Sequence, residues 1–172
     1  MRSTFPITAK LCRTSFTPSI GYVWSLFCTF FILTLCGCNS SVAYHQFRPV
    51  DVDNWYIKDT LRFDIPASSL IGDYTLSVGL RYQQDYAYRN VWVVVEQDYT
   101  TPTYKTRDTL EVVLADEADR LKGRGTSLLQ IEQPCTSVHL APRQHATIKV
   151  YHITRPEHIS GISDVGIRLS RD

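Results

Sequence analysis

Cys38 is the residue whose position most directly indicates a chemical modification. It follows Gly37 at the end of an apolar segment, residues 20–35, whose polar interruptions are only Gly, Ser and Thr. Three basic residues and no acidic residue lie upstream of this segment. A charged start, an apolar stretch and a small residue before Cys are typical of a bacterial lipoprotein signal peptide. The sequence therefore predicts that the chain is cut before Cys38 and that the Cys38 thiol is joined to diacylglycerol.

The alternative for this segment is an uncleaved helix that spans the membrane. Such a helix usually needs about 20 apolar residues, whereas the Gly37-Cys38 pair and the polar residues 39–41 favour lipoprotein processing. Two or three acyl chains hold a protein stably, because each buried methylene contributes about 0.8 kcal/mol. We expect a membrane, contacted through palmitate or a similar lipid on Cys38, to be a partner, and the cell envelope to be the location.

The remaining cysteines leave one thiol for the folded part of the chain. Cys12, Cys28 and Cys36 fall in the removed segment and Cys38 is used by the lipid, so Cys135 has no partner for an intrachain disulfide. We expect Cys135 to be a small, buried hydrophobic side chain; a reactive or intermolecular thiol is the alternative.

Four histidines near the C-terminus, at positions 139, 145, 152 and 158, raise the question of a metal site. Zinc motifs place two ligands within a few residues of each other, which this spacing does not do. We expect unliganded histidines at the surface or rim of the fold, and no metal or other cofactor. A serine elbow of the Gly-x-Ser-x-Gly type is also absent from the sequence, so we predict no catalytic residue, no enzyme activity and no evident small-molecule substrate.

The aromatic segment 82–90 is the best candidate for a contact surface. It contains Tyr82, Tyr86, Tyr88 and Arg89 beside amide and acidic side chains. Such tyrosines stack on sugar rings in binding modules, and Tyr and Arg are enriched where proteins bind each other. A structural corner, in which the tyrosine hydroxyls bond to loop backbone, is the third possibility. All three remain open from the sequence.

Charge excludes one class of partner. Loss of the three basic residues before Cys38 changes the formal net charge from +1 to −2. No basic stripe is present, so nucleic acid is not an expected partner.

Elements with period-two alternation must position these residues. Apolar and polar side chains alternate in short segments after Cys38, which predicts strands that bury one face; these segments are 61–65, 74–81, 109–114, 147–151 and 165–170. We predict an all-β chain, with a single antiparallel β-sandwich at 55–172 that follows a signal peptide at 1–37 and a lipidated tether at 38–54. Gly123 and Gly125 are expected to supply positive φ angles in a loop.

Residues 91–95, Val-Trp-Val-Val-Val, do not alternate. A strand that is apolar throughout is typical of one covered on both faces. We therefore expect a central strand here, with Trp92 in the core.

With these features, the exported part resembles one known family, the GldH lipoproteins of gliding bacteria. The resemblance runs from about residue 44 to residue 168 and rests on an ordered set of features: the lipobox ending at Cys38, Trp55 with 58–59, the strand 61–65, the strand 74–81, the turn 85–91, the strand starting at 108–110 and ending at 114–116, the pair Gly123 and Gly125, and the terminal 162–168. It implies a membrane-anchored accessory protein of the gliding machinery and its associated secretion system, with envelope proteins as partners and no known catalytic residues. A non-catalytic interaction lipoprotein is the leading hypothesis, and an envelope glycan-binding module is the alternative.

Overall fold

The computed structural model describes residues 41–67, 70–100 and 102–171, and these residues form strands and no helix. The strands are β1 (Val42–Pro49), β2 (Trp55–Tyr56), β3 (Leu61–Ile65), β4 (Gly72–Gln83), β5 (Asn90–Thr100), β6 (Thr103–Val113), β7 (Leu128–Leu140), β8 (Ala146–His152), β9 (His158–Ile159) and β10 (Ile162–Ser170). Within these residues no helix is long and apolar enough to cross a membrane.

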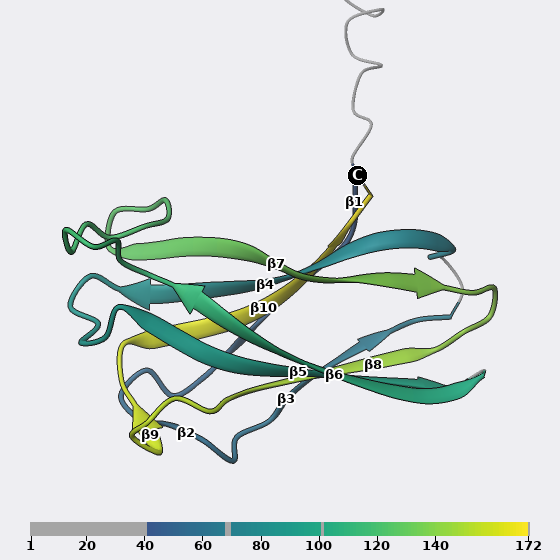
Figure 1. Cartoon of the computed structure of the whole chain (residues 1–172), viewed down its shortest axis with the longest axis horizontal. Coiled ribbons are helices and arrows are strands. Elements are labelled where there is room, and N and C mark those ends of the chain that lie inside the picture. The colour runs from purple at the N-terminus through teal and green to yellow at the C-terminus, as the bar shows by residue number, and fades with distance from the viewer. Residues whose placement is uncertain (1–40, 68–69, 101, 172) are drawn as a thin grey trace, which may run out of the picture. The chain divides into compact units, whose positions relative to one another are not determined.

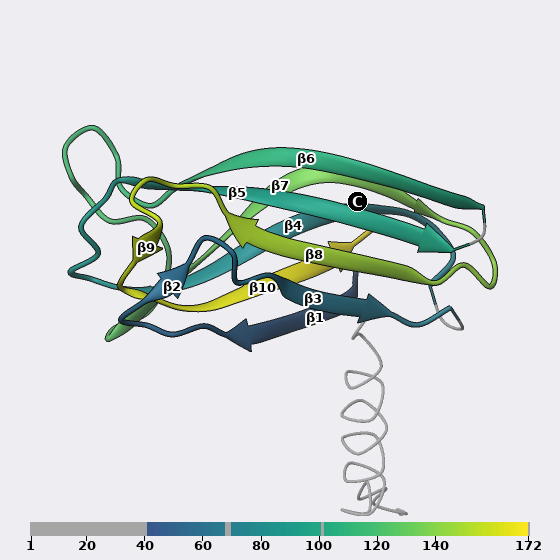
Figure 2. The ribbon, with the colours of Figure 1, turned by 90° about the horizontal axis from the view of Figure 1, so that it is seen from below.

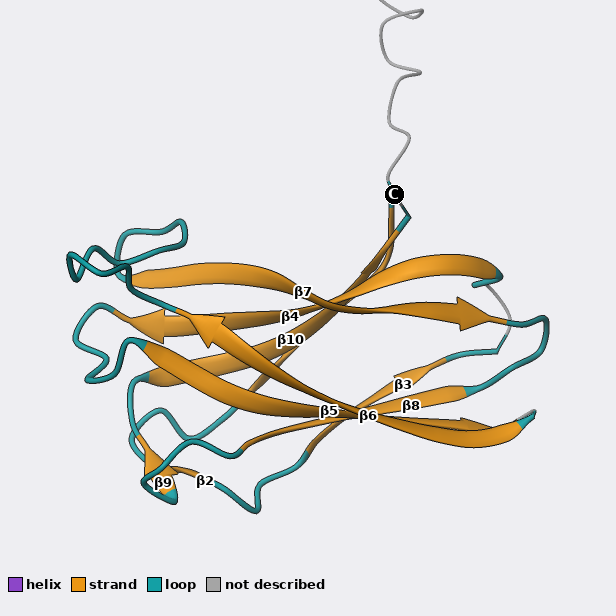
Figure 3. Cartoon of the chain, in the orientation of Figure 1, coloured by secondary structure: helices purple, strands orange, loops and turns teal. Residues whose placement is uncertain are grey.

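Two four-stranded antiparallel sheets pack face to face, as Figures 1 and 3 show. The first has the order β1-β10-β4-β7 and the second β3-β8-β5-β6, while β2 and β9 form a small separate pair. Figure 2 shows the two layers from below. The predicted all-β sandwich is confirmed.

The core comes from the alternation visible in the sequence. In β4 the side chains of Tyr74, Leu76, Val78 and Leu80 are buried, and in β10 every second residue from Val165 to Leu169 is buried as well. Successive side chains of a strand point to opposite faces, so each strand contributes one apolar row to the space between the sheets.

The long edge strand β7 was not among the predicted strands. Pro134 lies in its middle, where it pairs with Ser77, and the register shifts there because Cys135 is an extra residue between the partners of Leu76 and Ser77. Proline lacks the N–H that a central strand needs, so it is confined to edge strands and bulges. β7 satisfies both conditions. Cys135 packs against the core but is only half-buried, less than the full burial expected.

The predicted tether at 38–54 is wrong for its central part, because residues 42–49 form β1 and pair with β10 over its whole length. The Phe47 ring explains the pairing. It lies flat over Gly166 and Gly79, where an added Cβ atom would come within 2.7 and 2.8 Å of ring atoms. Arg81 covers the ring, with its guanidinium carbon 4.2 Å from the ring centroid. Two facing glycines therefore make a slot that fixes β1 on the sheet.

The prediction for residues 91–95 is half correct. β5 is an interior strand between β8 and β6, and Val91, Val93 and Val95 are buried. Trp92, however, points out of the sandwich and is 40% exposed, so its expected place in the core is wrong. Among the residues that the structure describes, no further layer covers this face of the sheet.

Strand directions define two ends of the sandwich. One end, which we call the entry end, is where β1, β4, β6 and β8 begin. In Figure 1 the starts of β4 and β6 lie on the right. The turn 84–89 and the long loop between β6 and β7 lie at the opposite end, which we call the tyrosine end. β10 connects the ends from Ile162, the partner of Tyr82, to Ser170, the partner of Val42. At about 3.4 Å per residue this strand spans roughly 27 Å.

Candidate functional site

Cys38, the predicted lipidation site, lies outside the described residues. The described chain begins three residues later, at Ser41, whose carbonyl accepts a hydrogen bond from the Arg171 backbone N–H at 2.9 Å. The chain therefore enters the folded domain beside its own C-terminal strand, at the entry end.

At the tyrosine end, Tyr82 is a structural side chain. It is fully buried, and its hydroxyl donates to the Leu114 carbonyl at 3.1 Å and also contacts the Lys122 carbonyl. Both acceptors belong to the segment that leaves β6, so Tyr82 joins β4 to that segment. Burial raises the pKa of the Tyr82 hydroxyl.

Tyr86 extends the same corner. Its ring is buried 6.4 Å from the Tyr82 ring in an edge-to-face arrangement, and its hydroxyl donates to the Asn90 carbonyl at 3.4 Å. Burial is also the main cause that raises its pKa. Gly161, with a φ of +91°, passes so close that an added Cβ would lie 3.1 Å from the Tyr86 ring. Tyr82 and Tyr86 are therefore corner residues, in keeping with the third of the possibilities that the sequence left open, and their buried side chains leave Tyr88 and Arg89 as the exposed members of the set.

Tyr88 and Arg89 are exposed, with 39% of Tyr88 and 52% of the Arg89 side chain accessible. The Tyr88 ring leans on the Tyr86 ring at 5.7 Å. Arg89 pairs with Asp119 at 3.3 Å and donates to the Asp116 carbonyl, which ties the turn to the loop after β6. These two side chains remain available to a partner while the residues behind them are fixed.

Trp92 adds an aromatic side chain that the sequence prediction did not include in this surface. The Trp92 carbonyl accepts a hydrogen bond from the Ile153 N–H at 2.8 Å, which sets the two residues side by side across β5 and the end of β8. Ile153 is 39% exposed. We call the exposed side chains of Tyr88, Arg89, Trp92 and Ile153 the Trp92 surface.

A hollow of about 430 Å³ adjoins the Trp92 surface. Asn90 and Glu111 line it, and the Asn90 amide donates to the Glu111 carboxylate. Glu111 is also the cross-strand partner of Trp92 in the register of β5 and β6. The rest of the lining is mixed in charge and consists of Arg89, Val113, Ala115, Asp116, Glu117 and Lys122. The indole thus lies beside a polar depression whose amide and carboxylate are held together.

The four histidines do not gather in one group among the described residues. His139 contacts Asp73 at 2.7 Å at the entry end, and His158 stacks on Tyr56 with the ring centroids 4.5 Å apart. His152 was expected at the surface or rim, and this is wrong, because it is fully buried with its Nε2 atom 3.1 Å from the Trp55 carbonyl. Desolvation lowers the pKa of His152. Among the described residues no three His, Cys, Asp or Glu side chains form a metal-binding group.

Comparisons with solved structures give only weak likenesses. An uncharacterized protein from Listeria monocytogenes aligns with a TM-score of 0.39 and 14% identity over 77% of this chain and 11% of that chain. The cycloalternan-forming enzyme of the same organism, solved with a pentasaccharide substrate, aligns with a TM-score of 0.36 and 14% identity, again over 77% and 11% of the two chains. TM-scores below 0.5 carry no argument about function.

Sequence comparison is more informative. The Gliding motility lipoprotein GldH of Flavobacterium johnsoniae is 25% identical over 150 residues, which cover 81% of this chain and 91% of that protein. The model of the GldH lipoprotein family matches residues 42–169, from the first residue of β1 to the last residue but one of β10. The resemblance inferred from the sequence is confirmed, and the chain belongs to the GldH lipoprotein family.

Proposed function

We propose that this protein is a non-catalytic accessory component of the gliding machinery and its associated secretion system. It is held at a membrane of the cell envelope by a lipid on Cys38, and it binds an envelope protein through the Trp92 surface. Membership in a lipoprotein family supports the membrane attachment. The name of the related protein from Flavobacterium johnsoniae supports the link to gliding.

The observation that carries this proposal is that the chain enters the sandwich at one end and the exposed aromatic side chains lie toward the other. The chain enters at Ser41 at the entry end, and the exposed Tyr88, Arg89 and Trp92 lie toward the tyrosine end. A lipid at Cys38 then leaves this surface directed away from its own attachment point. Trp, Tyr and Arg are the side chains that most often dominate the binding energy of protein interfaces. Tyr88 leans on the buried Tyr86 ring, and Arg89 is held by Asp119 and the Asp116 carbonyl.

The test is capture of envelope proteins by the full-length lipidated chain, crosslinked mildly in its own membranes. Trp92→Ala should weaken capture of a defined partner by about 30-fold, the equivalent of the 2 kcal/mol typical of an aromatic anchor. Leu128→Ala is the matched control, because Leu128 is also 40% exposed but lies at the start of β7 in the other sheet. Undiminished capture by a folded Trp92→Ala variant would contradict the proposed interface.

Glycan binding is the second candidate, and the Asn90–Glu111 pair beside Trp92 favours it. A ring face provides apolar contact to a sugar. The amide can donate hydrogen bonds to sugar hydroxyls, and the carboxylate can accept hydrogen bonds from them. Cosedimentation of the full chain with purified peptidoglycan tests this candidate. Binding that is lost in Asn90→Ala and kept in Leu128→Ala would support it, whereas no cosedimentation with protein capture intact would exclude it for this polymer.

A further inference from the structure

The first step is the length of chain between the proposed lipid and the fold. Cys38 and Ser41 are three residues apart, so even a fully extended backbone separates them by at most about 11 Å. The headgroup layer of one leaflet is itself roughly 5–8 Å thick. Because β1 begins at Val42 instead of after a long tether, a lipid on Cys38 brings the entry end of the sandwich to the membrane surface. This step rests on the attachment proposed above.

The second step is the chemistry of the entry end beside Ser41. The Arg171 backbone donates to Ser41, and its side-chain Nη2 donates to the Ile71 carbonyl at 2.8 Å and lies 3.2 Å from the Tyr74 hydroxyl. The guanidinium carbon stands 5.3 Å from the centroid of the Tyr74 ring. Among the described residues, these contacts hold the Arg171 side chain through Nη2 alone of its three nitrogens. Within that part of the chain the N–H groups on Nε and Nη1 are left for an anion, since a guanidinium carries five donors.

Ile71 lies next to this guanidinium and is 52% exposed, the largest exposure among the large hydrophobic side chains of the described residues. It precedes Gly72, whose φ of +117° turns the chain into β4. Together with Asp73, Ser137 and Arg171, Gly72 lines a hollow of about 360 Å³. Asp73, the carboxylate among the described lining residues, is bonded to His139 at 2.7 Å. The entry end thus carries an exposed apolar side chain, Ile71, and a cation that bonds to the Ile71 carbonyl.

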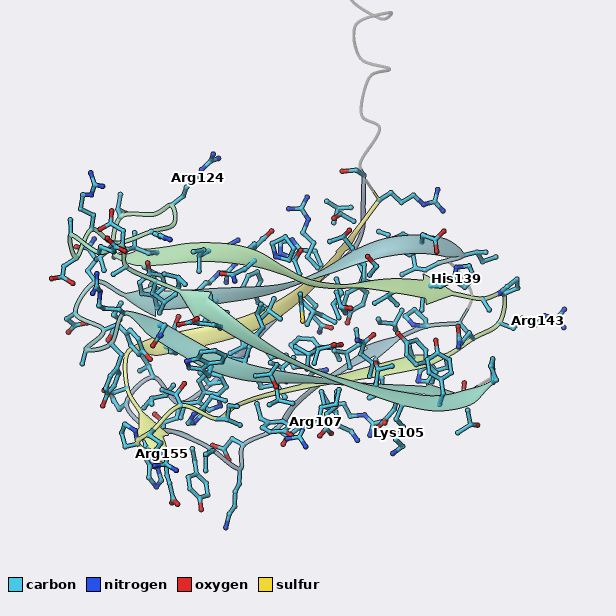
Figure 4. The ribbon with its side chains drawn as sticks, in the orientation of Figure 1. Lys105, Arg107, Arg124, His139, Arg143 and Arg155 are labelled. Atoms are coloured by element: carbon cyan, nitrogen blue, oxygen red, sulfur yellow. The ribbon has the colours of Figure 1, made fainter. Side chains whose placement is uncertain are left out.

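We propose that the entry end is a second membrane contact, in which Ile71 enters the interfacial layer of the lipids and Arg171 pairs with a lipid phosphate. Arginine pairs with phosphate through parallel N–H donors, and an apolar side chain in the interfacial layer adds buried area to the hold of the acyl chains. Arg143, at the tip of the loop between β7 and β8, extends from the same end as His139 in Figure 4 and adds positive charge toward anionic lipids. The contact holds the domain upright, with the Trp92 surface away from the bilayer.

The test uses the full lipidated chain in vesicles of phosphatidylethanolamine and phosphatidylglycerol, part of which carry bromine near the top of their acyl chains. Bromine quenches tryptophan emission on contact, so an introduced tryptophan reports whether its position reaches the lipid. Ile71→Trp should add emission that brominated lipid quenches, relative to the parent protein. Leu128→Trp, at the tyrosine end, should add emission that is not quenched. Unquenched emission at position 71, or equal quenching at both positions, would overturn the proposal.

The role of Arg171 is tested in the Ile71→Trp background. Arg171→Gln should reduce the quenching at position 71 and Arg171→Lys should retain most of it, because the lysine keeps the charge. Equal quenching in all three proteins would overturn the phosphate contact. Palmitate labelling of the same preparations separates the two proposals: a labelled protein without quenching at position 71 refutes this inference alone, whereas an unlabelled protein refutes the attachment on which it depends.

Discussion

Substitution of Gly79 by Ala is the sharpest test of how β1 is held, because its effect on stability should change sign with the residue at position 47. Gly79 lies in β4 opposite Gly166 of β10, and the Phe47 ring from β1 crosses both. An added Cβ at Gly79 would lie 2.8 Å from the Phe47 ring and 3.5 Å from Glu132 Cγ, which is an ordinary contact. The ring alone is therefore in the way.

In the parent protein, Gly79→Ala should lower the free energy of unfolding by about 1–3 kcal/mol, the usual cost of overpacking. For a domain of this size that corresponds to a fall in Tm of roughly 3–15 °C. In a Phe47→Ala background the same change should raise the free energy of unfolding by about 0.5–1 kcal/mol, because glycine within a strand is less favourable than alanine. The assay is thermal and chemical denaturation of the four proteins of this double-mutant cycle.

Gly166→Ala provides the internal control. Its Cβ would lie 2.7 Å from the Phe47 ring but also 2.9 Å from the Gln46 carbonyl oxygen. Removal of the ring leaves the backbone clash, so Phe47→Ala should not reverse the sign at Gly166. If Gly79→Ala has the same effect in both backgrounds, the Phe47 ring does not lie in the glycine slot. β1 would then be free to act as a tether, and the inference that Cys38 holds the entry end close to the membrane would fail.

Three further predictions address the anchor, the corner and the buried histidine. Cys38→Ala should abolish metabolic labelling with palmitate and leave the precursor uncleaved at Gly37, so labelling that persists in this variant would refute the lipoprotein assignment. Tyr82→Phe should lower the free energy of unfolding by about 1 kcal/mol, since it removes the hydroxyl that donates to Leu114, while Tyr88→Phe should leave Tm unchanged; equal effects would contradict the corner. Because burial holds the pKa of His152 below its usual value of 6.5, the unfolded chain binds the proton more readily, and stability should be constant above about pH 7 and fall as the pH drops through about 6.5. A melt at pH 5.5 should show this loss in the parent and less of it in His152→Gln, and identical slopes in both would refute the assignment to His152.

Alternation predicted the strands that bury one complete face, because in such strands the apolar side chains mark the buried face and the polar side chains mark the exposed face. The alternation of residues 74–81 already indicates that Tyr82 is a core residue. The side chains at the even positions from Tyr74 to Leu80 are buried, and Tyr82 is the next even position. That signal separates Tyr82 from Tyr88 without a structure. β1 gives no such signal, because its side chains are only half-buried or exposed, and its place depends on glycines more than 30 residues away along the chain.

Trp92 shows the opposite failure. Five apolar residues in a row suggested cover on both faces, yet on the outer face of β5 Trp92 is exposed while Val94 is buried. Val94 is 1% exposed although it points outward, and its neighbours in register are Thr109 of β6 and Tyr151 of β8. A tyrosine that bonds Glu96 at 2.9 Å can lie across a valine and bury it without a second layer. Sequence alone does not reveal which neighbours a strand will have, so it does not separate a valine covered by another sheet from one covered by a tyrosine beside it.

The two ends of the sandwich make opposite demands on the chain, and the residues at each end meet them in different ways. At the entry end a stiff attachment is needed if a short link is to orient the domain, and the Phe47 slot and the Arg171 bond to Ser41 provide it. At the tyrosine end a partner needs side chains that are exposed but already ordered, and Tyr82 and Tyr86 order Tyr88 from below. In the proposed arrangement, rigid attachment would favour binding, because a surface held away from the bilayer has fewer orientations to lose when a partner docks, which lowers the entropic cost of association. A flexible tether would serve a partner at variable distance; a docked β1 fits a partner that stands at a fixed height above the membrane.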